Sequence, residues 1–144
     1  MIKEKVVMMK TNQDTLSENI YLVNLMQQEF IDTRLKKLGL TAHQARALNY
    51  IGFNPGVIQK KLANYLGKQD ATVTNILKVL EKKVYIERKI PEDNERQKNL
   101  FLTEQGLELT QEIRKIFDDL NQHVIDGLAE DEQAQLKKLL KKIQ

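Results

Sequence analysis

The stretch KKLANYLGKQDATVTNILKVLEKK, residues 60–83, contains two short helical patterns with a glycine between them. In the first pattern, which we place at residues 58–66, apolar side chains recur at helical spacing until Gly67 ends the helix. The second pattern, residues 70–83, separates into two faces. Its apolar stripe is Val73, Ile76, Leu77 and Leu80, and its opposite face, which is small, polar and basic, is Ala71, Asn75, Lys78 and Lys82. The order predicts a helix, a turn and a second helix whose polar face is free for a partner.

Two alternating segments follow this second helix and predict a two-stranded β-hairpin. Isoleucine and charged residues alternate over 86–90, and leucines alternate with other residues over 99–103. Turn-forming residues, Pro91-Glu92-Asp93-Asn94, lie between the two segments. An exposed helix fits the major groove of DNA, and a hairpin beside it extends contacts to the backbone or the minor groove. We therefore predict a winged helix-turn-helix unit over residues 41–103.

Long amphipathic patterns flank this unit on both sides. One runs from Thr15 to about Lys37, another begins after a second threonine cap at Thr103 and is interrupted at Gly127, and a last one closes the chain over 130–143. A capping box of Thr41 and Gln44 starts a further helix that ends before Asn54. Residues 1–14 lack a cap and a period, and we expect a mobile arm or a fraying helix extension there.

The terminal helices have broad apolar faces that one small winged unit cannot cover. A partner chain is the economical way to bury them, so we predict a homodimer. At 144 residues the chain is about one domain long, and 41% hydrophobic residues are enough for a core. The predicted architecture is a single domain over residues 1–144, mainly α with a small β-hairpin wing, in which 15–40 and 104–144 are dimerisation helices.

Composition excludes several classes of function. The chain has no cysteine, which removes disulfides, thiolate nucleophiles and cysteine-ligated zinc, and its only histidines are His43 and His123. We find no nucleophile–base pair, phosphate-cradling glycine loop or metal-ligand cluster, and we expect no enzyme, no cofactor and no metal. No apolar run reaches the length of a secretory or membrane segment, so a cytoplasmic protein is expected, away from the membrane. A net charge of +3 is compatible with nucleic acid without demanding it.

At this point the residues resemble the MarR/SlyA family of bacterial regulators through nearly the whole chain. The resemblance rests on five pieces of sequence. They are Leu62-Ala63 with Leu66-Gly67, Thr72-Val73-Thr74, Leu80-Glu81-Lys82-Lys83, Arg96 six residues before Leu102-Thr103, and Gly106. The resemblance implies a dimer joined by its first and last helices, with the wing arginine, Arg96, reaching DNA.

Three positions depart from the family pattern. Asn94 stands where the family has an acidic residue before the wing arginine, and the neighbouring Asp93 is a displaced candidate. Val84 replaces the glycine that follows the recognition helix; because a β-branched residue disfavours the left-handed helix end, we expect the helix to end differently or to run on. Gln69 replaces a serine, so Asp70 is the expected cap of the second helix.

The candidate DNA-binding residues lie on the second helix, on the turn before it and on the wing. They are Lys68, Gln69, Thr72, Thr74, Asn75, Lys78, Arg88, Lys89, Arg96 and Lys98. Asn can bond an adenine edge in two places and a Thr methyl can meet a thymine methyl, whereas Lys favours phosphate. The charges of the hairpin also allow a simpler interpretation, in which the cations are neutralised by neighbouring acids.

The predicted function is that of a sequence-specific transcriptional regulator, with repression as the expected direction. It would bind a pseudo-palindromic operator in double-stranded DNA as a homodimer. Two modes stay open: release by a small-molecule effector, or constitutive binding. The alternative is a protein-interaction module that uses the winged fold without specific DNA binding, an alternative motivated by the modest net charge and the acids of the wing. Salt-dependent binding to duplex DNA distinguishes the two.

Overall fold

The computed structural model describes residues 14–93 and 97–144. The elements run in the order α2 (Leu16–Leu35), the 3₁₀ turn η1 (Lys36–Leu38), α3 (Ala42–Phe53), β1 (Val57–Ile58), α4 (Gln59–Leu66), α5 (Asp70–Lys82), β2 (Ile86–Lys89), β3 (Asn99–Leu102), α6 (Glu104–Ile125) and α7 (Glu130–Ile143). Helices make up most of the described chain, which confirms the predicted mainly helical class. The arm predicted for residues 1–14 lies, apart from Asp14, outside the described residues.

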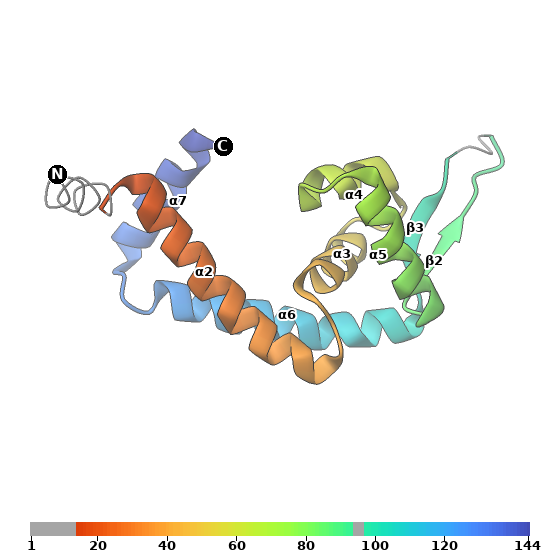
Figure 1. The fold of residues 1–144 in the computed structure, drawn as a ribbon, viewed down its shortest axis with the longest axis horizontal. Helices are drawn as coiled ribbons and strands as arrows, with labels where there is room; N and C mark the ends of the chain where they lie inside the picture. The colour runs from red at the N-terminus through yellow and green to blue at the C-terminus, as the bar shows by residue number, and fades with distance from the viewer. Residues whose placement is uncertain (1–13, 94–96) are drawn as a thin grey trace, which may run out of the picture.

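The long helix α6 joins two ends of an elongated molecule (Figure 1). One end gathers α3, α4, α5 and the strands β2 and β3, while the other contains the first half of α2, the end of α6 and α7. Helix α6 packs against α2, α3 and β3, so it links the two ends of the molecule. The polar recognition face and the apolar terminal helices are therefore far apart in the fold.

The predicted caps at Thr41 and Thr103 form in the structure. Thr41 Oγ1 accepts a hydrogen bond from the Gln44 N–H at 3.2 Å, and Gln44 Oε1 accepts one from the Thr41 N–H at 3.1 Å, which completes the capping box. Thr103 Oγ1 accepts from the Gly106 N–H at 3.1 Å and begins α6. These bonds satisfy backbone donors that a helix leaves free in its first turn.

The sheet has three strands, where the sequence predicted two. The hairpin strands β2 and β3 pair as expected, with Ile86 opposite Leu102, and the short strand β1 adds to the other edge of β3, with Val57 opposite Leu100. Consequently α4 begins at Gln59 and not at Ile58, which is in β1. The prediction missed β1 because two residues are too short to show an alternating pattern.

The core lies between α3, α5, β3, α6 and the end of α2. Of the predicted stripe on α5, Val73, Leu77 and Leu80 are fully buried, and Ile76 packs against the core at its edge. Leu48 of α3 and Ile113 of α6 are also fully buried. The apolar stripe of α5 therefore holds this helix from behind and leaves its other side toward solvent.

The end of α5 contradicts the expectation for Val84. The helix ends at Lys82 and Val84 itself adopts the left-handed conformation, with φ of 63°. The Val84 N–H donates to Glu81 O at 2.9 Å and the Tyr85 N–H donates to Leu80 O at 3.0 Å, which is the Schellman pattern. Thr103 Oγ1 also donates to Val84 O at 2.6 Å. Together these bonds offset a left-handed penalty of about 1–2 kcal/mol, and so the helix ends in a left-handed residue although that residue is a valine.

The terminal helices leave their apolar side chains exposed. Helix α7 has no buried residue, and the first two thirds of α2 are also largely uncovered. The exposed apolar residues of these helices are Leu16, Ile20, Tyr21, Leu22, Val23, Leu25, Leu136, Leu139, Leu140 and Ile143. Among the described residues, no helix is long and apolar enough to cross a membrane.

Candidate nucleic-acid interface

The outward face of α5 lies on the surface beside the wing (Figure 1). Thr72, Asn75 and Lys78 are exposed on this helix, and Lys68 and Gln69 are exposed in the turn that precedes it. The buried stripe points the opposite way, so the exposed side chains are available to a molecule that approaches this end. The structure thus brings together most of the candidate residues from the second helix.

The start of α5 differs from the prediction. Gln69 is the cap residue, its side chain makes no capping bond, and Asp70 is the first residue of the helix. The Asp70 carboxylate instead accepts a hydrogen bond from Gln59 Nε2 at 2.9 Å. The prediction that Asp70 caps the helix is wrong, because its backbone is already helical and α4 engages its side chain.

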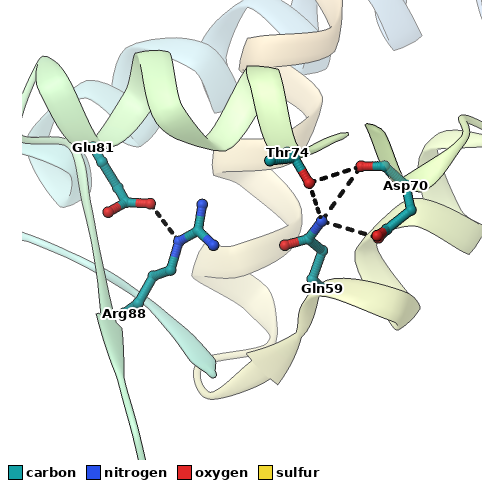
Figure 2. A network of polar contacts seen from close by, with 5 residues as sticks. All are labelled: Gln59, Asp70, Thr74, Glu81 and Arg88. Carbon is teal, nitrogen blue, oxygen red and sulfur yellow. Dashed lines mark hydrogen bonds and ion pairs between the residues drawn. The ribbon is translucent and has the colours of Figure 1, made fainter. Parts of the chain in front are cut away.

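Two polar contacts hold one flank of α5 (Figure 2). At one contact, Gln59 Nε2 donates to Thr74 Oγ1 at 2.8 Å, and the Thr74 hydroxyl donates to Asp70 O at 2.9 Å. At the other, Arg88 Nε of β2 donates to Glu81 Oε1 of α5, and only 16% of the Arg88 side chain is exposed. Thr74 and Arg88, both candidate DNA contacts, are thus already engaged within the chain.

The remaining candidates on the wing have different surroundings. Lys89 lies 3.5 Å from Glu87 and its ammonium is 5.0 Å from the centre of the Phe101 ring, yet 63% of its side chain is exposed. Lys98 is exposed. Arg96 and Asn94 lie outside the described residues, whereas Asp93, the displaced candidate acid, is exposed in a turn.

A hollow of about 350 Å³ separates α5 from the wing. Its lining residues are Lys78, Glu81, Arg88, Ile90 and Lys98. Three cationic side chains surround one carboxylate, and that carboxylate is already paired with Arg88. The hollow therefore favours an anion such as a phosphate, which is the most frequent partner of Lys and Arg in DNA complexes.

A larger groove of about 820 Å³ lies where α2 meets α3 and α4. Polar residues of α2, including Asn24, Gln28 and Asp32, face His43 and Tyr65 across it. Burial, followed by the positive charges of Lys68 and Arg46, lowers the pKa of His43, and Asp32 opposes this shift. The sequence did not predict this groove, since its lining comes from three separate segments.

Sequence reasoning also missed Gln59 and Glu81 as parts of the interface. Gln59 contacts residues 11 and 15 positions later in the chain, and Glu81 contacts a residue on another element. Neither contact has a local signal, because a helical or alternating period relates only residues of the same element.

Comparisons with known proteins agree with this geometry. The model of the MarR family matches residues 38–97. The uncharacterized HTH-type transcriptional regulator YybA of Bacillus subtilis (strain 168) is 31% identical over 108 residues, which are 75% of this chain and 72% of YybA.

Among solved structures, the chain resembles a putative MarR family transcriptional regulator from Listeria monocytogenes in complex with a 26mer DNA. The two are 29% identical with a TM-score of 0.84, over 90% of this chain and 87% of the other. The MepR–DNA complex of S. aureus is 29% identical with a TM-score of 0.82, over 92% and 96% of the two chains.

The match therefore extends well beyond the helix-turn-helix segment to the terminal helices. The two solved structures share the fold of this chain over 92% and 90% of its length. This chain belongs to the MarR/SlyA family of winged helix-turn-helix transcriptional regulators.

Proposed function

We propose that this protein is a sequence-specific regulator that binds a pseudo-palindromic operator as a homodimer and acts as a repressor. The observation that carries the proposal is the exposed polar face of α5, which lies beside a cationic hollow and a wing at one end of the fold. Helix α5 enters the major groove, and the wing follows the backbone or the minor groove. Two similar proteins have been solved with DNA, which supports the same use of this fold.

The homodimer is supported by the exposed terminal helices. Helix α7 buries none of its side chains in its own chain, although Leu136, Leu139 and Leu140 form a continuous stripe. A second copy covers this stripe and the exposed side of α2, because a two-fold axis lets the same face serve both partners. We therefore assign residues 15–40 and 104–144 to dimerisation and residues 41–103 to DNA binding.

Two-fold symmetry determines how the dimer reads DNA. The two copies of α5 enter successive major grooves on one face of the duplex, about 34 Å apart. Asn75, exposed at the centre of the outward face, is placed to bond an adenine edge. A·T pairs near the centre of each half-site follow from this placement.

Release by a small effector is supported by the groove between α2, α3 and α4. A molecule in this groove contacts both the terminal helix α2 and the helix-turn-helix unit. Its binding therefore changes how the two copies of α5 in the dimer are placed relative to each other. The lining of the groove combines polar side chains with the apolar Ile31, Leu40 and Leu66, which suits a small organic molecule that has both hydrogen-bonding groups and an apolar part. Repression follows when the bound dimer blocks the promoter, and this role belongs in the cytoplasm.

Selection of bound duplexes from a random pool tests this function. The enriched sequences are expected to show two symmetric half-sites about one helical turn apart, and affinity is expected to fall steeply as salt rises. Asn75→Ala should cost about 1–3 kcal/mol on the selected duplex and little on random duplex. Absence of salt-dependent duplex binding would favour the protein-interaction module instead.

A further inference from the structure

One flank of α5 is held by directional polar contacts, while its back is held by apolar packing. Thr74 and Glu81 are seven residues apart, which places them on the same flank, two turns from each other. Gln59 engages the first and Arg88 the second, from α4 and from the wing (Figure 2). The outward residues Asn75 and Lys78 lie next to this flank and stay exposed.

The hydroxyl of Thr74 already has hydrogen-bond partners within the chain. That hydroxyl has one hydrogen, which it donates to Asp70 O at 2.9 Å, so it accepts from Gln59 Nε2 at 2.8 Å. The same amide nitrogen also lies 2.9 Å from Asp70 Oδ1 and 3.4 Å from Asp70 O. All these partners are acceptors, so only one orientation of the Gln59 amide satisfies them. Thr74 has no hydrogen left for a base.

The Arg88 contact uses the Nε–H, which is one of the five donors of the guanidinium. Arg88 lies opposite Leu100 in the sheet, and its Nε donates to Glu81 on α5. Its side chain is 16% exposed, compared with 63% for the neighbouring Lys89. A long cation that contacts phosphate must reach outward, whereas this one reaches from the wing to α5 and forms part of the wall of the hollow between them.

Apolar packing alone sets only the approximate rotation of α5 about its axis. Burial of Val73, Leu77 and Leu80 draws the helix onto the core, but the hydrophobic effect has no direction. Hydrogen bonds weaken when their angles change, so contacts on one flank resist rotation. Base readout requires side chains held to within about 10–20°.

We propose that Gln59 and Arg88 are positioning residues that set the rotation of α5, and that neither they nor the hydroxyl of Thr74 contact DNA. This inference rests on the proposed function and names the residues that determine its specificity. Gln59 fixes the first turn of α5 to α4, and Arg88 fixes the last turns to the wing. Together they determine which base edges Asn75 reaches.

The test measures the ratio of affinities for two probes: the best duplex selected by the wild-type protein, and a random duplex of equal length. Gln59→Ala and Glu81→Ala should each lower this ratio about fivefold to tenfold. Thr74→Val, which keeps the side-chain shape and removes the hydroxyl, should lower it similarly. Glu81→Gln keeps an acceptor for Arg88 and should restore most of the ratio, although it removes the same charge as the alanine variant.

A matched control separates positioning from charge. Glu87→Ala removes an acid from the exposed side of the same wing strand, and it should strengthen binding to both probes equally. If Arg88 were a phosphate contact, Glu81→Ala would behave like this control, and Arg88→Ala would weaken both probes and reduce the salt slope by about one. That pattern would overturn the positioning role.

The double variant Glu81→Ala/Arg88→Ala gives an independent measure. Since both residues act through one contact, its ratio should equal that of either single variant. Additive losses would contradict the proposal. If the wild-type protein does not discriminate between the probes, the proposed function and this inference both fail; if it discriminates and the flank variants do so equally well, only this inference fails. Thermal melting of every variant shows that each one is folded.

Discussion

The replacement Gly106→Ala tests how closely α6 packs on the root of the wing. A Cβ built at this position would lie 2.0 Å from Tyr85 O and 2.9 Å from Tyr85 C, whereas real Cβ contacts are not shorter than 3.0 Å. The obstacle is backbone, so α6 or β2 must move by about 1 Å. The Thr103 N–H, which donates to Tyr85 O at 3.0 Å, and the Thr103 hydroxyl, which donates to Val84 O, would move with it.

The expected change in the free energy of unfolding of Gly106→Ala is the sum of opposing effects. Overpacking costs about 1–3 kcal/mol and a weakened hydrogen bond about 1 kcal/mol. Alanine recovers about 1 kcal/mol, because it forms helix better than glycine. The free energy of unfolding should therefore fall by about 1–3 kcal/mol, although helix propensity alone predicts a gain.

Urea unfolding followed by far-ultraviolet circular dichroism measures this change, at one protein concentration because dimer stability depends on it. Gly127→Ala is the matched control: nothing lies within 4 Å of its added Cβ, and its φ is not positive. It should stabilise the protein by about 0.4–1 kcal/mol. Equal stabilisation by both replacements would refute the packing argument.

Three further predictions concern charge, assembly and pH. Lys78→Ala, at the edge of the cationic hollow, should weaken binding to all duplexes alike and lower the salt slope by about one; a loss confined to the selected duplex would make Lys78 a base contact. A chain that ends at Gly127 should sediment as a monomer while keeping its core, because no residue of α7 is buried within its own chain, and a remaining dimer would reject this assignment. The pKa of His43 is lowered, so the unfolded chain binds that proton more tightly, and stability present above about pH 6.5 is lost as the pH falls. The melting temperature should thus drop less in His43→Gln between pH 7.5 and 5.5, and identical slopes would speak against it.

Part of the candidate interface could be predicted from the sequence, because that part depends only on residues close together in the chain. The outward face of α5, with Thr72, Asn75 and Lys78, follows from a helical period whose apolar side must face the core. Which of the polar side chains are free could not be predicted. Thr74 and Arg88 are residue types that often contact DNA. Only the tertiary structure shows that both side chains already have partners within the chain.

The sequence by itself determined the helices, the caps at Thr41 and Thr103 and the hairpin, because each depends on residues within about four positions or on one alternating segment. The capping box at Thr41 and the stripe of α5 are examples. Tertiary structure decided the third strand, where Val57 pairs with Leu100, and the left-handed Val84, whose local preference is overruled by bonds from Tyr85 and Thr103. It also decided the contacts of Gln59 and Glu81. In each of these cases the partner belongs to another element, and only folding brings the two together.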